Sequence, residues 1–154
     1  MDDAFRIVRE IGRGSYGVVY EAEQVALGRR VALKMLHPDA ALCTSARERF
    51  RREARIASSL QHPNAVAIYH CGFHVAGQRE LPYIAMEYLE GRDLHAAMVE
   101  EGRLSSDEAR ALLRQVLDPL IEAHDKGVVH RDLKPENLLL CRGANGSAPV
   151  VKVL

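Results

Sequence analysis

The chain has 154 residues, and its 21 basic and 21 acidic side chains leave a formal net charge of zero. A balanced charge excludes a strong overall field toward nucleic acid or an anionic membrane, and this length suffices for one domain or a small two-lobed unit. Three widely spaced cysteines, an acidic start and no long apolar run lead us to expect a reduced, cytoplasmic protein, with neither a signal peptide nor a membrane segment in this stretch.

The first predicted element is a strand at residues 5–11, followed by the segment Gly-Arg-Gly-Ser-Tyr-Gly at 12–17 and the segment Val-Val-Tyr-Glu-Ala at 18–22. The glycine spacing alone is a weak signal, because an ordinary hairpin turn also accounts for it. The β-branched residues Val18 and Val19 favour a strand after the glycines, whereas a dinucleotide-binding fingerprint opens a helix and a Walker loop needs Lys before Ser or Thr. Two strands joined by glycines allow backbone N–H groups to approach phosphate oxygens.

A short strand predicted at residues 31–36 carries one charge, Lys34. The next helix, predicted over 45–60 from a Ser-x-x-Glu capping box and a following Pro, supplies a carboxylate for it. Helical spacing places Glu53 in the middle of the apolar stripe, where a charge costs free energy unless it is paired. We expect an ion pair between Lys34 and Glu53; the alternative is that Glu53 reaches water or pairs with Arg49.

Two further strands are predicted over residues 65–74 and 81–86. The first contains His70, Cys71 and His74, which together raise the hypothesis of a metal site. Four residues of strand separate the two histidines by about 13 Å, and the cysteine faces the other way. We therefore expect ordinary core and surface side chains there.

A long helix is predicted to start with a second capping box, Ser105 to Glu108, and to end at Gly127. It has a broad apolar face made of Leu112, Leu113, Val116, Leu117, Leu120 and Ile121. Pro119 lies inside this pattern and should kink the helix or split it at Asp118.

The most informative segment is His-Arg-Asp-Leu-Lys-Pro-Glu-Asn at residues 130–137. Asp132 and Asn137 are five residues apart, with Lys134 between them and Pro135 barring a helix. Such a segment can present a carboxylate to accept a hydroxyl proton, an ammonium to face a moving phosphoryl group and an amide carbonyl to hold a metal. The alternative is a solvated turn, and for His130 we expect a structural, loop-supporting role.

This segment resembles the catalytic loop of protein kinases, His-Arg-Asp-x-x-x-x-Asn, and the glycine segment and Val-Ala-Leu-Lys at 31–34 resemble their nucleotide-binding strands. The chain is similar to serine/threonine protein kinase domains: Lys134 separates it from tyrosine kinases, and Arg131 from small-molecule phosphotransferases. The segments Arg-Phe-Arg-Arg-Glu-Ala and Met-Glu-Tyr-Leu-Glu-Gly resemble bacterial members.

The resemblance implies an α+β, protein kinase-like bilobal fold. It implies an antiparallel five-stranded N-lobe sheet plus one helix over residues 1–86, a hinge over 87–93, and an incomplete helical C-lobe over 94–154.

The resemblance also implies ATP and Mg²⁺ as cofactors and a protein Ser or Thr hydroxyl as acceptor. It makes Asp132 the catalytic base, Lys134 the charge at the γ-phosphate and Asn137 a Mg²⁺ ligand. The Lys34–Glu53 pair would hold the α- and β-phosphates. The further nucleotide contacts that it implies are Ile11, Gly12, Gly14, Gly17, Val19, Ala32, Met86, the backbone of Glu87 and Leu89, Asp93 and Leu139. For Asp93 a helix N-cap is the alternative, and one residue can serve both roles.

In this family the final strand, residues 150–154, runs into Asp-Phe-Gly, which is not in this sequence. We therefore expect residues 1–154 alone to be inactive and to self-associate through an exposed C-lobe surface. The alternative function is a pseudokinase-like nucleotide-binding or interaction module, and Asp-Phe-Gly directly after Leu154 would favour the enzyme.

Overall fold

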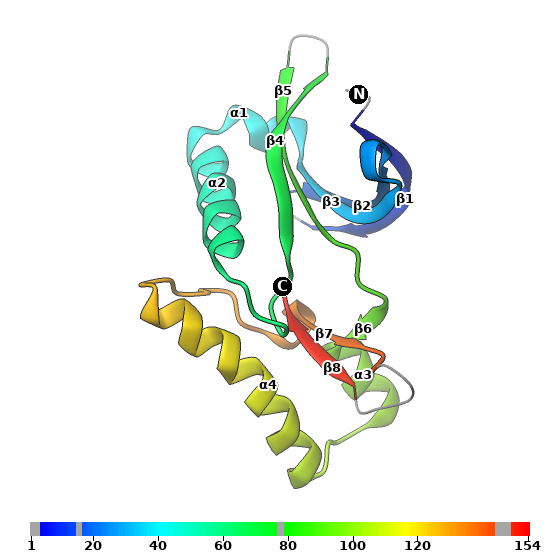
Figure 1. The fold of residues 1–154 in the computed structure, drawn as a ribbon, viewed down its shortest axis with the longest axis vertical. Coiled ribbons are helices and arrows are strands. Elements are labelled where there is room, and N and C mark those ends of the chain that lie inside the picture. The colour runs from blue at the N-terminus through cyan, green and yellow to red at the C-terminus, as the bar shows by residue number, and fades with distance from the viewer. Residues whose placement is uncertain (1–3, 15–16, 77–78, 144–148) are drawn as a thin grey trace. The chain divides into compact units, whose positions relative to one another are not determined.

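The structure is a computed structural model that describes residues 4–14, 17–76, 79–143 and 149–154, except for the side chains at 49, 51, 53–57, 59 and 76 (Figure 1). The chain divides into a first unit, Met1–Ser59 with Ala67–Tyr88, and a second unit, Leu60–Val66 with Leu89–Leu154. Each unit has its own sheet and its own hydrophobic core. None of the described helices is long and apolar enough to cross a membrane.

The first unit is an antiparallel five-stranded sheet in the order β1-β2-β3-β5-β4, which confirms the predicted sheet. Its strands are β1 (Phe5–Arg13), β2 (Gly17–Gln24), β3 (Arg29–Leu36), β4 (Ile68–Ala76) and β5 (Arg79–Glu87). Its helical elements are the 3-10 turn η1 (Val25–Leu27), α1 (Pro38–Leu42) and α2 (Thr44–Ser59). Figure 1 shows α1 and α2 beside β4 and β5. The short α1 is additional to the one helix expected, and Ser45 lies inside α2 rather than before it.

The two faces of β3 enter two different cores, because side chains alternate along a strand. On one face, Leu33 packs with Phe5 and Ala85. Val31 and Met35 of the same strand belong to this core as well. Leu36 packs on the other face with Phe50 of α2 and Ile84 of β5. The β3 strand is therefore buried on both sides, and α2 covers the face that bears Leu36.

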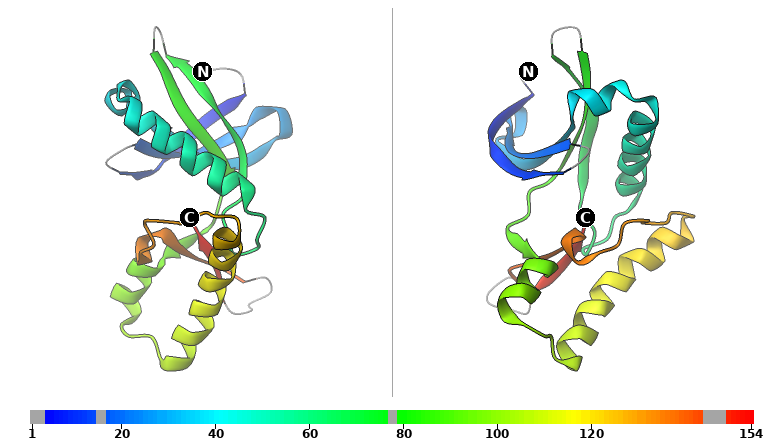
Figure 2. Two further views of the ribbon diagram at one scale, coloured as in Figure 1. Left: turned by 90° about the vertical axis from the view of Figure 1, so that its left-hand side faces the viewer. Right: turned by 180° about the vertical axis from the view of Figure 1, so that it is seen from behind.

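The second unit contains a three-stranded antiparallel sheet and two helices. Its strands are β6 (Gly91–Asp93), β7 (Leu138–Cys141) and β8 (Val150–Val153) in that order. Its helices are α3 (Leu94–Glu101), α4 (Ser106–Asp125) and the 3-10 turn η2 (Pro135–Asn137). Val116 of α4 packs with Leu138 of β7 and Val151 of β8 in the core, so that α4 lies along the sheet (Figure 2).

Helix α4 confirms its predicted start and excludes one of the two effects expected of Pro119, the split at Asp118. The Ser105 Oγ accepts from the Glu108 N–H at 3.3 Å, and the Glu108 carboxylate accepts from the Ser105 N–H at 2.9 Å. The expected split at Asp118 is wrong, since α4 runs through Pro119 as one helix. The Pro119 ring is fully buried, and its packing offsets the backbone hydrogen bond that a proline removes.

The segment between α2 and β4 belongs to the second unit, so that the predicted strand at 65–74 begins only at Ile68. Ala65 forms a single parallel bridge with Val153, and the Asn64 carbonyl accepts from the Val153 N–H at 2.7 Å. The Asn64 side chain donates to the carbonyl of Val151 at 2.8 Å. These bonds attach residues 64–66 to β8 instead of to the five-stranded sheet.

Candidate active site

The loop from His130 to Asn137 is closed by one turn of 3-10 helix. The sequence led us to expect no helical structure beside Pro135, yet η2 begins at this residue. A proline suits the first position of a helical turn, because its missing N–H has no partner there and its φ angle is already fixed. The Asn137 N–H donates to the Lys134 carbonyl at 2.9 Å. This turn brings the Asn137 side chain back toward Asp132.

Three polar side chains meet in this loop. The Asn137 Nδ2 donates to the backbone carbonyl of Asp132 at 2.7 Å and to its Oδ2 at 3.0 Å. The Lys134 Nζ lies 3.1 Å from the same Oδ2. The structure therefore places a carboxylate, an ammonium and an amide next to one another, as a phosphoryl-transfer site requires.

The surroundings of Asp132 favour its charged form. A hydrogen bond from the Lys134 ammonium, and a second from the Asn137 amide, hold the pKa of the Asp132 carboxyl below its ordinary value of 3.8. The side chain is 67% exposed, so a hydroxyl group can reach it. Asp132 is thus an ionised, accessible proton acceptor at neutral pH.

His130 and Arg131 shape the backbone that leads to Asp132. The Asp132 N–H donates to His130 Nδ1 at 3.3 Å, and His130 Nε2 lies 2.9 Å from the Leu154 carbonyl. An accepting Nδ1 assigns the proton to Nε2, which then donates to that carbonyl. Arg131 adopts a left-handed φ of 67°, a conformation that turns the chain sharply and is uncommon outside glycine. The Leu154 N–H in turn donates to the Asn137 carbonyl at 2.9 Å, so the end of β8 supports the loop.

In the first unit, Lys34 and three predicted nucleotide contacts lie on one face of the sheet. Val19 of β2 is directly opposite Lys34 of β3, and Ala32 is directly opposite Met86 of β5. Directly opposite residues share a face, and so do residues two apart along a strand. Leu36 shares this face as well, so Lys34 is on the side that α2 covers. The backbone of α2 includes Glu53, whose side chain lies outside the described part of the chain; the Lys34–Glu53 pair stays a prediction.

The three glycines before and within β2 differ in what a side chain would meet. A methyl group at Gly17 would lie 2.2 Å from the Met35 carbonyl oxygen, so packing alone requires glycine there. The same group would be 3.9 Å from its nearest neighbour at Gly12 and 4.0 Å at Gly14, which are ordinary contacts. Packing therefore does not explain the glycines at positions 12 and 14. Ile11 lies at an irregularity of β1 and is partly exposed.

At the end of β5 the chain passes from the first unit to the second, between Tyr88 and Leu89. The Glu87 N–H donates to the Ala67 carbonyl at 2.8 Å. A contact from the Glu87 backbone to a nucleotide would therefore use its carbonyl oxygen. Leu89 is half-buried.

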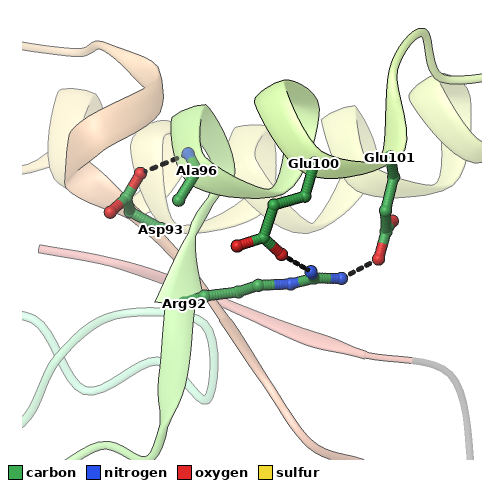
Figure 3. A network of polar contacts seen from close by, with 5 residues as sticks. All are labelled: Arg92, Asp93, Ala96, Glu100 and Glu101. Atoms are coloured by element: carbon green, nitrogen blue, oxygen red, sulfur yellow. Dashed lines mark hydrogen bonds and ion pairs between the residues drawn. The ribbon is translucent and has the colours of Figure 1, made fainter.

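Asp93 is the N-cap of α3, which was the alternative that the sequence left open. Its Oδ1 accepts from the Ala96 N–H at 2.8 Å, while Arg92 extends to the other end of α3 and pairs with Glu100 at 2.7 Å and with Glu101 (Figure 3). A carboxylate can accept further bonds at its second oxygen, so capping does not prevent a ribose contact.

Leu139 of β7 is directly opposite Asp93 of β6. Its two neighbours in the strand, Leu138 and Leu140, pack in the core of the second unit. Side-chain alternation therefore turns Leu139 to the opposite face of the sheet, beside Asp93. The two predicted nucleotide contacts of the second unit are thus neighbours.

Comparison with known proteins agrees with these features. Residues 5–153 match the protein kinase domain family. The chain is 42% identical over 151 residues to the serine/threonine-protein kinase Pkn1 of Myxococcus xanthus, covering 98% of this chain and 21% of the relative. It is 42% identical over 136 residues to the serine/threonine-protein kinase PrkC of Bacillus subtilis, covering 88% and 20%. The chain thus spans about a fifth of the length of these curated relatives.

A solved structure gives the same result for the fold. The kinase domain of PknI from Mycobacterium tuberculosis superposes with a TM-score of 0.80 at 28% identity, over 98% of this chain and 58% of that structure. The chain belongs to the protein kinase domain family and is similar to bacterial serine/threonine-protein kinases.

Proposed function

We propose that this domain transfers the γ-phosphate of ATP to serine or threonine hydroxyls of proteins. The observation that carries the proposal is the meeting of Asp132, Lys134 and Asn137, with Lys134 Nζ at 3.1 Å and Asn137 Nδ2 at 3.0 Å from one carboxylate oxygen. The printed names of the bacterial relatives, which are serine/threonine-protein kinases, support this acceptor class.

Asp132 would accept the proton of the acceptor hydroxyl, since its carboxylate is ionised and exposed. Lys134 would then face the transferring phosphoryl group, where its charge stabilises the negative charge of the transition state. In the absence of substrate this ammonium contacts Asp132, and we expect it to move toward the phosphate when ATP is bound.

The donor set of the loop fits a magnesium ion. The Asn137 Nδ2 makes both bonds to Asp132, so its carbonyl oxygen Oδ1 points elsewhere and is the kind of hard oxygen that Mg²⁺ prefers. Asn137 would hold the ion, and the bound ion would neutralise charge on the phosphates.

The first unit would bind the rest of the nucleotide. Gly12 and Gly14 would let the backbone approach the phosphates, and Lys34, oriented by Glu53, would pair with the α- and β-phosphates. On the same face of the sheet, Val19, Ala32 and Met86 would surround the adenine, with Ile11 and Gly17 beside them. The Glu87 carbonyl and the Leu89 backbone would hydrogen-bond its edge. In the second unit, Asp93 would contact the ribose and Leu139 the adenine.

These roles imply an N-lobe over residues 1–86, a hinge over 87–93 and the beginning of a C-lobe over 94–154. The passage of the chain from the first unit to the second between Tyr88 and Leu89 supports this position for the hinge. We further propose that the domain acts in the cytoplasm, because its proposed reaction consumes ATP.

The test is phosphoryl transfer by the natural protein that contains these residues, with a general protein substrate and labelled ATP. Asp132→Ala should lower kcat by about 10²–10⁴-fold, the usual contribution of a positioned base. Asp125→Ala, at an exposed aspartate at the end of α4, is the matched control and should keep full activity. Equal activity in both variants would refute the assignment of Asp132. Tight binding of ATP with Mg²⁺ and no transfer by the unmodified protein would favour the pseudokinase-like alternative.

A further inference from the structure

A buried carboxylate in the first unit has no part in the site as the sequence predicted it. Glu21 in the middle of β2 is 7% exposed and is the one buried charged residue among those that the structure describes. Its Oε2 lies 2.8 Å from Arg9 Nη2 of β1, and its Oε1 lies 3.7 Å from Arg30 Nη1 of β3. The third partner is Tyr88, whose hydroxyl donates to Glu21 Oε2 at 3.2 Å.

The same partners also contact Tyr88 directly. Arg9 Nη2 donates to the Tyr88 hydroxyl at 3.2 Å, and the guanidinium carbon of Arg30 lies 4.7 Å from the centroid of the Tyr88 ring. The ring is thus held at its hydroxyl by Arg9 and Glu21 and over its face by Arg30. Three strands converge on the residue that directly follows β5.

The register of the sheet explains why these side chains meet. Arg9 is directly opposite Glu21 across β1 and β2, and Val31 is directly opposite Glu87 across β3 and β5. Because β3 and β5 are antiparallel, the residue before Val31 and the residue after Glu87 come next to each other, which places Tyr88 beside Arg30. A buried charge is costly unless it is paired, so removing one member leaves the others poorly compensated. We therefore expect the cluster to act as one unit and to fix the position of Tyr88.

We propose that Glu21 and Tyr88 are positioning residues for adenine recognition. Tyr88 lies between Glu87 and Leu89, whose backbone groups bind the adenine edge in the function proposed above, and the inference rests on that function. Neither the Glu21 carboxylate nor the Tyr88 hydroxyl needs to touch the nucleotide. By fixing the Tyr88 side chain to β1, β2 and β3, the cluster sets the direction of the two adenine-binding backbone groups on either side.

The test compares nucleotide affinities of the purified chain carrying Tyr88→Phe, Glu21→Ala or both. We expect each single variant to bind ATP with Mg²⁺ more weakly, by about 2- to 12-fold for each hydrogen bond that the Tyr88 hydroxyl loses. The ratio of ATP affinity to GTP affinity should fall as well. The affinity for inorganic tripolyphosphate, which has no base, should stay constant. Because both changes break the bond between the Tyr88 hydroxyl and Glu21, the loss of affinity in the double variant should be smaller than the sum of the two single losses.

Glu23→Ala is the matched control, since Glu23 lies two residues along the same strand and forms a more exposed ion pair with Arg6 of β1 at 3.2 Å. It should leave both affinities unchanged. Unaltered ATP affinity in Tyr88→Phe and Glu21→Ala overturns the inference. An equal loss of affinity for ATP and for tripolyphosphate also overturns it, because it indicates a general destabilisation of the nucleotide site. If Glu21→Ala does not fold, Tyr88→Phe decides the matter, because it removes a single hydroxyl. Absence of ATP binding by the unmodified chain would instead refute the proposed function.

Discussion

The Lys134 ammonium lies 3.1 Å from the Asp132 carboxylate, two residues away on the loop from His130 to Asn137. This contact is the first of the causes that lower the pKa of Asp132. The residue that we propose to stabilise the phosphoryl group therefore also keeps the proposed base ionised before substrate arrives.

We expect Lys134→Met to raise the pKa of Asp132 toward its ordinary value of 3.8. A carboxyl whose folded pKa is lowered contributes stability above its unfolded pKa and loses it as the pH falls through the folded pKa. The variant should therefore be slightly less stable than the unmodified chain at neutral pH. At a pH below the folded pKa of Asp132 in the unmodified chain, the two proteins should be equally stable. A carbon-detected NMR titration of the Asp132 carboxyl measures the shift directly.

Lys126→Met is the control for that titration. Lys126 pairs with Glu122 on α4 at 2.6 Å and is the first cause of its lowered pKa. The control should raise the pKa of Glu122 and leave that of Asp132 alone. An Asp132 titration that is identical in the Lys134→Met variant and the unmodified chain would show that Lys134 does not set it.

The glycines of the first unit should separate into a structural and a functional class. Gly17→Ala pushes a methyl group against the Met35 carbonyl at 2.2 Å, and such overpacking typically costs about 1–3 kcal/mol. Gly14→Ala meets its nearest neighbour only at 4.0 Å, so its free energy of unfolding should change little while ATP binding weakens. Urea unfolding and nucleotide titration of both variants test this, and a stable Gly17→Ala protein would contradict the packing argument.

Asn64 should be important for the stability of the second unit. Its side chain donates to the Val151 carbonyl at 2.8 Å and to Gln115 Oε1 at 3.1 Å, and that oxygen also accepts from the Val151 N–H at 3.0 Å. Asn64→Ala leaves the carbonyl of the buried Val151 without this donor, which should cost about 1–3 kcal/mol. Thermal unfolding of Asn64→Ala, Gln115→Ala and the double variant should show non-additive losses. Additive losses would mean that the two side chains act independently.

Most of the fold was predictable because its signals are local. A short apolar run with one charge indicated the strand that carries Lys34, and the capping box of Ser105 and Glu108 indicated the start of α4. The meeting of Asp132, Lys134 and Asn137 was predictable because the three residues lie within a stretch of six, so that one turn of chain brings them together.

The features that the sequence did not reveal depend on partners far along the chain. Pro119 is tolerated inside α4 because the core covers its ring, and burial cannot be inferred from helical spacing alone. Asn64 finds its partners 51 and 87 residues away. Glu21 looks like a solvent-facing strand residue until the register of three strands places Arg9 and Arg30 beside it. A charged residue in mid-strand with arginines on both neighbouring strands is the signal that could have indicated it.

Helix α4 should cause a polypeptide of residues 1–154 to self-associate. Val116 on its inner face is 3% exposed, whereas Leu113, Leu117 and Ile121, spaced four apart on another face, are 54%, 50% and 57% exposed. A contiguous apolar stripe of this kind favours association. Leu117→Lys should shift sedimentation toward the monomer, while Val99→Lys, at an exposed valine of α3 that is not part of this stripe, should not. A monomer at all concentrations would contradict this expectation.

A polypeptide of residues 1–154 should bind nucleotide without transferring phosphate. The kinase reaction uses two groups to hold its metal ions, an asparagine of the catalytic loop and an aspartate of Asp-Phe-Gly. Asn137 is the one predicted metal ligand in this sequence, and its amide is already fixed against Asp132. Loss of one metal-holding group leaves charge on the transferring phosphoryl unneutralised, which slows the chemical step far more than it weakens binding.

Incubation with labelled ATP, Mg²⁺ and a protein substrate should therefore give no incorporation above background, whereas fluorescence titration should detect bound nucleotide. Incorporation by this polypeptide that disappears in Asp132→Ala would show that residues 1–154 hold a complete catalytic site.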